Sequence, residues 1–472
     1  MNRSVILAVV LTAWLPTAGP FQLIGYLGPV AIAAAALWAG WVALSWRDLA
    51  FGAVFASLSV GTALVHQETG FLHPVIGMLT YSSVALLLLR PSAPHADVEA
   101  GCRTLLVATA WISLFEAALG LLQLILSQRG LVFATAASGD YVVGTLGTNS
   151  HLFAVKMLFQ GLILTVGWRH ASAVPALHTR KRLLAWGAAA AFGGALFASA
   201  LLASAAFIAA VATWYIWTTG RSTIRQLADG TATIRGLARS WRIGLLAVLG
   251  LGVVGQAFYA TQPANAELIV AVAGQVFRGR IRLQKFVALQ ESVERVLLAD
   301  LPTAVFGTGL GRYSSRAAMI LSGGYLRNHP DWIPVSRSDE THERIYSKWR
   351  PATWPEYRGS IIGMPTSSAQ SVLAEFGLFG TSLLAWYVAG LLRRARALRR
   401  RLAPHSLQAA LIDAQPLMLL CLLGVSFTDV WLEYASFMAP VYLVVVMCLS
   451  VTTPPSNRAQ ATAAEPRAGL AV

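Results

Sequence analysis

Three basic residues have a spacing that could bind phosphate. Arg278, Arg282 and Lys285 recur at intervals of four and three residues, so they would line one face of a helix. The planar guanidinium group of arginine suits bidentate hydrogen bonding to phosphate or pyrophosphate. A helix with such a face could equally lie along a membrane with its arginines among anionic head groups. The charge pattern alone leaves both interpretations open.

A glycine-rich stretch, FGTGLGRY, follows at residues 306–313. Gly307, Gly309 and Gly311 precede Arg312, and the backbone N–H groups of such a turn can contact an anion. The stretch does not follow the strand of a predicted βαβ unit, so a dinucleotide-binding fold is not indicated. The motif therefore predicts an anion-binding turn and nothing more specific.

Four ionisable residues interrupt long apolar stretches, namely Glu116, Lys156, Glu375 and Asp413. A charge within hydrocarbon is costly and is kept there for a reason. Glu116 and Lys156 fall at similar depths of neighbouring stretches, so we expect a structural ion pair between them. Glu375 has no partner in its own stretch and is the stronger candidate for a catalytic carboxylate. Asp413 is expected to reach water or an arginine of the adjacent loop.

Residues 323–364 mix histidine, arginine, tryptophan and proline. Sugar-binding sites often have this texture, because aromatic rings stack on sugar C–H bonds, but aromatic residues also gather at membrane interfaces. His329 and His342 are candidate proton acceptors. The sequence contains no zinc-ligand spacing, P-loop or catalytic-serine motif, so no metal and no cofactor are predicted.

The composition places these residues on a membrane scaffold. Of the 472 residues, 56% are hydrophobic and 12% are charged, with a mean hydropathy of +0.60. Soluble domains carry about 25% charged residues, so a soluble enzyme, a disordered chain and a disulfide-stapled secreted domain are excluded. The net charge of +15 comes from basic residues that lie mainly in short loops between apolar stretches. That distribution orients membrane helices and does not indicate binding to nucleic acid.

Twelve apolar stretches are long enough to cross a bilayer, which takes about 20 residues per helix. The sequence therefore predicts an all-α integral membrane protein with about 12 transmembrane helices. The uncharged stretch 183–218 is counted as two short spans, because only then do the arginine-rich loops and both termini share the cytoplasmic side. The expected spans are 4–19, 22–45, 49–66, 71–89, 104–126, 149–168, 183–199, 201–218, 243–261, 366–392, 407–427 and 434–452.

These spans divide the chain into four parts. Residues 1–261 hold helices one to nine, 262–364 form one large outer loop, 365–453 hold helices ten to twelve, and 454–472 form a disordered tail rich in alanine and proline. A loop as long as 262–364 is usually functional. It contains both the arginine face and the glycine-rich turn.

Three short patches give the chain a resemblance to the O-antigen ligase / O-antigen polymerase (Wzy-like) superfamily of bacterial polysaccharide assembly. They are GTLGTNSHLFA at 144–154, an arginine-bearing helix followed by FGTGLGRY, from Arg282 to Tyr313, and SVLAEFGLFG at 371–380. The order of the patches and the single large loop before the last spans are also similar to that family. The likeness covers about residues 100–395.

The resemblance implies a metal-independent glycosyltransferase of GT-C-like architecture in the bacterial inner membrane, with its large loop in the periplasm. The donor would be a glycan on undecaprenyl pyrophosphate, and the acceptor a sugar hydroxyl. Membrane lipids, a flippase and a chain-length regulator would be its partners. Arg278, Arg282 and Arg312 would hold the pyrophosphate, while Glu375, His329 or His342 would position or deprotonate the acceptor. The remaining residues expected to line the same cavity are Gly144, Asn149, His151, Gly309 and Gly311.

Two departures from the family pattern affect the choice of reaction. Ligases usually have a His-Asn pair where this chain has Thr366 and Ser367, and an arginine where it reads DYVVG before residue 144. These gaps favour a polymerase over a ligase that transfers lipid-linked polymer to lipid A-core or another acceptor. A transporter of lipid-linked sugars is the alternative from another class, although no repeat relates the two halves of the chain.

Overall fold

The computed structural model describes the parts of the chain that form most of the predicted scaffold. The described residues are 2–14, 21–38, 42–65, 71–128, 142–146, 149–171, 175–198, 284–322, 334–336, 338, 366–403 and 406–453, with isolated positions between 256 and 278. The predicted span 201–218, nearly all of 243–261, and the tail 454–472 lie outside them. Arg282, His329 and His342 also lie outside the described residues.

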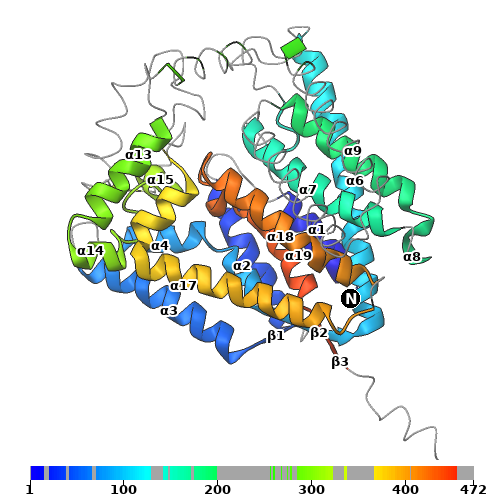
Figure 1. Cartoon of the computed structure of the whole chain (residues 1–472), viewed down its shortest axis with the longest axis horizontal. Helices are drawn as coiled ribbons and strands as arrows, with labels where there is room; N and C mark the ends of the chain where they lie inside the picture. Colours follow the sequence, from blue (N-terminus) through cyan, green and yellow to red (C-terminus); the bar gives the residue numbers. More distant parts are fainter. Residues whose placement is uncertain are drawn as a thin grey trace, which may run out of the picture.

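Helices make up most of the described chain (Figure 1). The N-terminal half contains α1 (Asn2–Ala13), α2 (Phe21–Trp38), α3 (Trp46–Val65), α4 (Leu72–Thr80), α5 (Val84–Leu87), α6 (His95–Gln128), α7 (Ser150–Ala171), α8 (Pro175–His178) and α9 (Lys181–Phe197). The rest contains α13 (Gln284–Ser292), the π-helical turn η2 (Val293–Leu297), α14 (Leu301–Phe306), α15 (Arg316–Leu321), α17 (Ser368–Arg399), α18 (Leu407–Ser426), the 3₁₀ turn η5 (Trp431–Glu433) and α19 (Ala435–Cys448).

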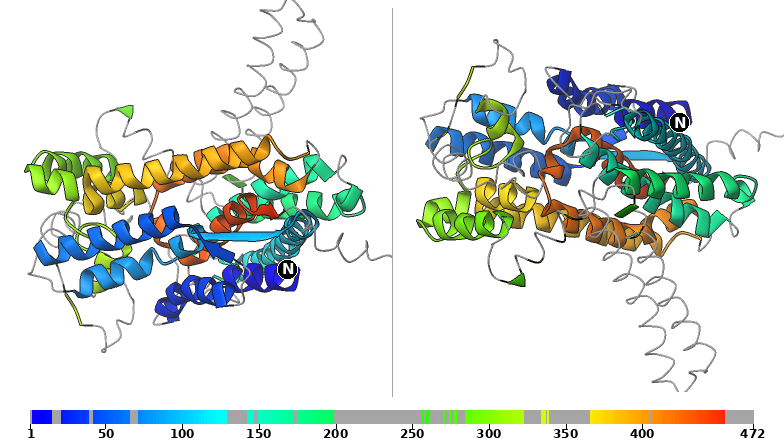
Figure 2. Two further views of the ribbon diagram at one scale, coloured as in Figure 1. Left: turned by 90° about the horizontal axis from the view of Figure 1, so that it is seen from below. Right: turned by 90° about the horizontal axis from the view of Figure 1, so that it is seen from above.

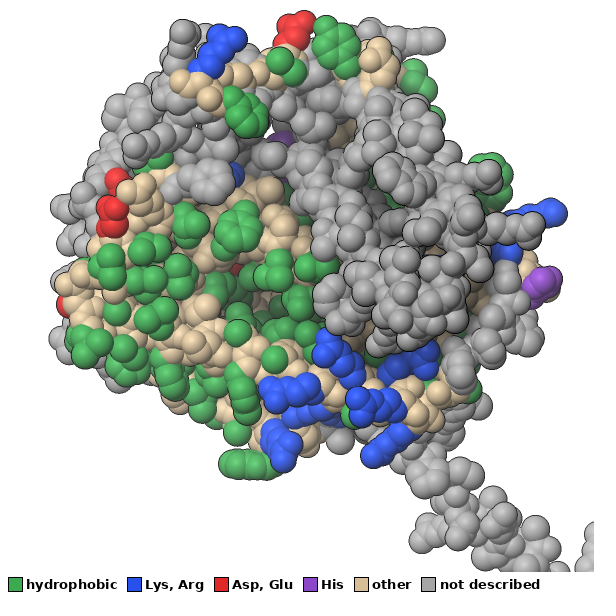
Figure 3. Space-filling view, viewed as in Figure 1, with side chains coloured by type: hydrophobic (Ala, Val, Ile, Leu, Met, Phe, Trp, Pro, Cys, Tyr) green, Lys and Arg blue, Asp and Glu red, His purple; other side chains and the backbone are tan. Residues whose placement is uncertain are grey.

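Four described helices are long and apolar enough to cross a membrane: Asp97–Ser127, Ser150–Ala171, Ser368–Arg399 and Leu407–Ser426. On α17 the apolar side chains of Leu378, Phe379 and Trp386 are exposed. Figure 3 shows apolar side chains spread over the face around α17, with basic side chains gathered beyond them. This arrangement suits a helical membrane protein, because a lipid-facing surface is apolar and its cytoplasmic border is basic.

The predicted span 71–89 is wrong as a continuous helix. Helix α4 ends at Thr80, a turn covers residues 81–83, and the short helix α5 is followed by strand β2 (Leu89–Pro94). The side chains at the turn bond to backbone carbonyls, Thr80 to Gly77 and Ser82 to Tyr26. Pro91 and Pro94 cannot extend a helix, because they lack an N–H group. The hydropathy of this stretch predicts that it is buried, but hydropathy does not predict where the helix is interrupted.

A small sheet is the second departure from a wholly helical fold. Strand β1 (Val42–Leu44) pairs antiparallel with β2, and β3 (Val451–Thr453) pairs parallel with β2. In the predicted topology these three segments belong to the same, cytoplasmic side. The sheet therefore ties together loops that the charge pattern also groups together.

A charge cluster around the buried carboxylate of Asp48 lies beside this sheet. Asp48 at the start of α3 contacts Arg90 on β2 at 2.6 Å and Arg394 on α17 at 3.2 Å, and it accepts a hydrogen bond from Tyr387 at 3.0 Å. The ring of Tyr387 stacks on Phe51 with 3.8 Å between ring centroids. The cluster and the start of α17 are at opposite ends of that helix, near β2 and near α14 respectively (Figures 1 and 2).

Candidate functional site

The candidate site is built around a kink in α17. Gly377 has φ 62° and ψ −170° inside this helix, which frees the carbonyl groups of the turn before it. The glycine-rich loop takes them up: Thr308 N–H donates to the Ala374 carbonyl at 2.9 Å and Gly309 N–H to the Glu375 carbonyl at 3.1 Å. A Cβ atom at Gly377 would lie 2.4 Å from the backbone nitrogen of Gly307. The second and third sequence patches therefore interlock, and glycine is what allows their backbones to approach.

The carboxylate of Glu375 occupies the anion-binding turn that the sequence predicts. Its Oε2 accepts a hydrogen bond from Gly311 N–H at 2.8 Å, and its Oε1 accepts from Tyr313 N–H at 3.0 Å and Ser315 N–H at 3.1 Å. The side chain is buried. The turn does bind an anion, but that anion is part of the protein. This geometry assigns Gly309 and Gly311 to the scaffold, and makes Glu375 a positioning residue with both oxygens engaged.

Glu433 is a second buried carboxylate under the same loop. Its Oε2 accepts from Arg316 N–H at 2.6 Å and from the hydroxyl of Thr80 at 3.4 Å. Burial raises the pKa of Glu433 well above its usual range, and the negative charge of Glu375 raises it further. Sequence reasoning missed Glu433, because it lies in a short loop rather than inside an apolar stretch.

Glu116 holds the first patch in the same way. Its carboxylate accepts hydrogen bonds from the backbone N–H of Thr145, at 2.9 Å, and from the Thr145 hydroxyl. Lys156 Nζ lies 3.7 Å from Glu116 Oε1 and also donates to the Ala13 carbonyl. Gly144 has φ 56°, and a Cβ atom there would lie 2.3 Å from Glu116 Oε2. The ion pair expected from the sequence is thus present and also anchors the 144–145 turn.

Tyr434 links the first patch to Arg316, which follows the second patch closely in the sequence. Asn149 caps α7 by accepting from Leu152 N–H at 2.8 Å, and its amide donates to the Tyr434 hydroxyl at 3.1 Å. The guanidinium of Arg316 lies 3.5 Å from the centroid of the Tyr434 ring. Arg312 is as deeply buried as Arg316, at 1% and 2% exposure. The cluster therefore holds two guanidinium groups within protein that excludes water.

His73 completes the cluster from α4. Its Nδ1 lies 2.5 Å from the Gly311 carbonyl and its Nε2 lies 2.9 Å from the Ser336 hydroxyl. Sequence reasoning missed His73, Arg316 and Tyr434 as well as Glu433. A histidine or aromatic residue at the end of an apolar stretch is ordinary in a membrane protein, so no signal separated them from an interfacial belt.

The other predicted site residues are placed less centrally. His151 is partly exposed in the first turn of α7. Arg278 is exposed, and its backbone N–H donates to the Gly274 carbonyl at 3.2 Å. The structure thus brings Asn149, Gly309, Gly311, Arg312 and Glu375 into one cluster, whereas Gly144 lies at the turn that Glu116 holds.

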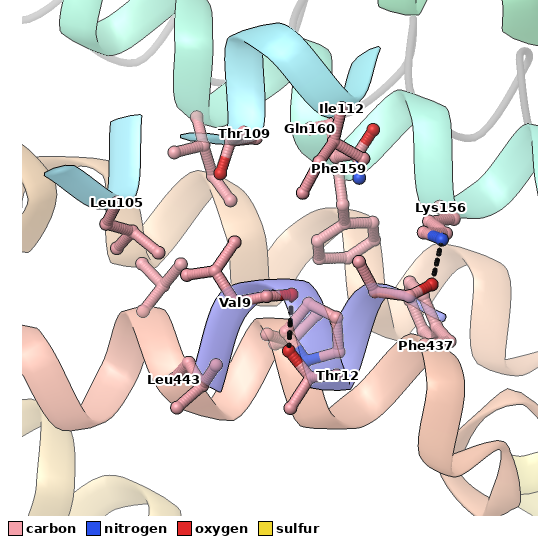
Figure 4. A pocket seen from close by; sticks show the side chains of 15 residues that line it. Val9, Thr12, Leu105, Thr109, Ile112, Lys156, Phe159, Gln160, Phe437 and Leu443 are labelled. Carbon is pink, nitrogen blue, oxygen red and sulfur yellow. Dashed lines mark hydrogen bonds between the residues drawn. The ribbon is translucent and has the colours of Figure 1, made fainter. Parts of the chain in front are cut away.

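A separate cavity lies between α1, α6, α7 and α19 (Figure 4). Its polar lining comes from Thr12, Thr109, Lys156 and Gln160. With a volume of about 30 Å³ it has room for one or two water molecules. It is too small for a sugar or a prenyl chain.

Comparisons with protein-family models, with curated proteins and with solved structures returned no match. Among the described residues, no group of three or more histidine, cysteine, aspartate or glutamate side chains is arranged to hold a metal ion.

Proposed function

We propose that the protein is a polysaccharide polymerase of the Wzy-like superfamily, in a bacterial inner membrane with both termini cytoplasmic. It would transfer glycan from undecaprenyl pyrophosphate to a sugar hydroxyl at the periplasmic face. The observation that supports this is that patches 282–313 and 371–380 interlock, and that Asn149 of patch 144–154 is linked to the same loop through Tyr434 and Arg316. Segments so far apart in the chain meet where the predicted outer ends of the spans meet.

The chemistry of the cluster suits a diphosphate leaving group. In glycosyl transfer the acceptor oxygen attacks the anomeric carbon while the bond to pyrophosphate breaks, so negative charge grows on the leaving group. Arginines held in place before the reaction stabilise such charge most strongly where water is excluded. Arg312 and Arg316 are candidates for this role from the described cluster, and Arg278 and Arg282 from the preceding helix. Lipid-linked donor, flippase and chain-length regulator are the partners that this reaction would need.

The start of α17 supports a polymerase over a ligase. Ser367 accepts from Gln370 N–H at 3.2 Å as the N-cap of this helix, and the Thr366 carbonyl accepts from Lys285 Nζ at 2.7 Å. The two residues at the place of the ligase His-Asn pair therefore have structural bonds and carry no imidazole. A ligase remains the second candidate, because the interlocked patches are common to the whole resemblance.

The first test is the glycan profile of a strain that lacks the protein. Single repeat units on the lipid carrier at the outer face would support the polymerase. Normal long polymer left on the carrier would indicate the ligase, and repeat units retained on the cytoplasmic face would indicate a transporter. Complementation with Arg316→Gln should fail to restore polymer, whereas Arg399→Gln, which removes a partly exposed pair with Asp413, should restore it.

A further inference from the structure

Lys285 occupies a distinctive place beside the cluster. It lies on α13, and its Nζ donates a hydrogen bond to the Thr366 carbonyl at 2.7 Å, next to the N-cap of α17. Its side chain is partly exposed. The neighbouring α13 residue Ala288 contacts α17 through Gln370, whose amide lies 3.5 Å from the Ala288 carbonyl. Lys285 is thus held at the edge of the buried site, where a solvent-borne hydroxyl group can approach.

Other described candidates for a general base in the cluster are already engaged. Glu375 accepts three backbone N–H bonds, and both ring nitrogens of His73 have partners. Glu433 accepts a backbone N–H and a hydroxyl through Oε2, and its side chain is fully buried beneath the loop, away from an incoming hydroxyl group. In contrast, a neutral amine at Lys285 keeps a lone pair after it donates to the Thr366 carbonyl.

The surroundings of Lys285 favour loss of its proton. Partial burial of the side chain lowers the pKa of Lys285 to about 8, although the negative charge of Asp429 opposes this shift. Other carboxylates on elements packed around it are Glu291, Glu294 and Glu375. With a pKa of about 8, roughly a tenth of the side chains are neutral at pH 7.

Within the proposed glycosyl transfer, we propose that neutral Lys285 is the general base for the acceptor hydroxyl. The hydroxyl proton passes to Nζ as the acceptor oxygen bonds to the anomeric carbon of the donor. The anomeric C–O bond to the carrier breaks, and its electron pair leaves with the prenyl pyrophosphate. Lys285 ends the step as an ammonium ion, which then loses its proton to water. No further reactant is needed.

The test is the pH dependence of chain elongation by the full-length protein in lipid bilayers. The probe is the set of lipid-linked repeat units isolated from the strain that lacks the protein. The wild-type rate should rise with pH, reach half of its maximum near pH 8 and level off about one pH unit higher, because the neutral amine is the active form. Lys285→Ala and Lys285→Arg should each lower the rate by 10²- to 10⁴-fold, the usual contribution of a general base. Added ethylamine should partly restore Lys285→Ala.

Asp429→Asn supplies a second readout that a merely structural lysine would not move. Removing this negative charge destabilises the protonated amine, so the rising limb should shift to lower pH while the plateau rate is kept. An active Lys285→Arg variant, or a wild-type rate that falls above pH 8, would overturn the inference by indicating that the cation is the active form. If the wild-type protein does not elongate the repeat units at all, the proposed function fails instead.

Discussion

Replacing Glu375 by glutamine tests whether this carboxylate positions the loop or reacts. Glutamine has the same shape, but only its oxygen can accept. If that oxygen keeps the bonds from Tyr313 and Ser315, the new NH₂ group faces the N–H of Gly311. An unsatisfied buried donor costs about 1–3 kcal/mol. Removing one of two neighbouring carboxylates relieves part of their repulsion, so we expect a net loss of about 2 kcal/mol.

A loss of that size is measurable in the loop itself. It raises the open population of the 307–316 loop about 30-fold, because 1.4 kcal/mol is a factor of ten. Limited proteolysis follows the open population when opening is faster than cleavage. The matched control is Asp413→Asn, which breaks a pair with Arg399 of 3.0 Å whose side chains are 46% and 29% exposed. Pairs of this kind contribute little, so the control should digest like the wild type.

The activity of the same variant separates the two roles. If Glu375 positions the loop, Glu375→Gln should keep a reduced elongation rate with the wild-type dependence on pH. A variant with wild-type resistance to protease that has lost both elongation and its pH dependence would refute this reasoning. It would show that Glu375 exchanges a proton with substrate despite its three backbone bonds.

Three further changes test other parts of the structure. Gly377→Ala should lower the melting temperature by several degrees, because a side chain at this φ and ψ costs about 1–3 kcal/mol and its Cβ atom would lie 2.4 Å from the backbone nitrogen of Gly307. Gly390→Ala is the control: a Cβ atom at this position of the same helix would have nothing within 4 Å, so the melting temperature should not fall. Tyr434→Phe removes the hydrogen bond with Asn149 and should lower the free energy of unfolding by about 1 kcal/mol, while chain elongation is kept. Tyr434→Leu also removes the contact between the ring and Arg316, so it should raise the KM for the lipid-linked donor. A cysteine that replaces exposed Glu294 should react with a membrane-impermeant thiol reagent in intact cells, whereas a cysteine that replaces exposed Arg400 should not. The three native cysteines are buried and should give a low background. The reverse labelling would overturn the predicted topology.

The sequence was most informative where a charge stood alone in apolar surroundings. The Glu116–Lys156 pair could be predicted because each charge needs a partner at its own depth. The contact of Glu116 with Thr145 could not, because it depends on how the turn after α6 folds back. Glu375 was identified for the same reason, because a charge in apolar surroundings is energetically costly. Its partners come from a loop some 60 residues earlier, which no periodicity within α17 can indicate.

Glycine motifs showed the right chemistry with the wrong ligand. The turn that begins at Gly307 was expected to bind an anion, and its backbone N–H groups do so, but the anion is Glu375. A glycine motif indicates that backbone N–H donors converge, but it does not indicate whether a carboxylate of the same chain already accepts their hydrogen bonds. The break in the helix at residues 81–83 was not predicted for a related reason. The sequence predicted correctly that this stretch is buried, but it did not predict that the helix is interrupted there.

The three buried carboxylates share one design that bears on function. Glu116 holds the 144–145 turn, Glu375 the glycine-rich loop and Glu433 the start of α15, each through backbone N–H groups. In each case a buried anion accepts hydrogen bonds from the backbone of the segment above it and so fixes the position of that segment. Catalysis of group transfer depends on donors and cations being in position before the substrate arrives. Under the proposed function, the buried carboxylates would build the platform, and the groups at its edge, with Lys285 foremost, would do the chemistry.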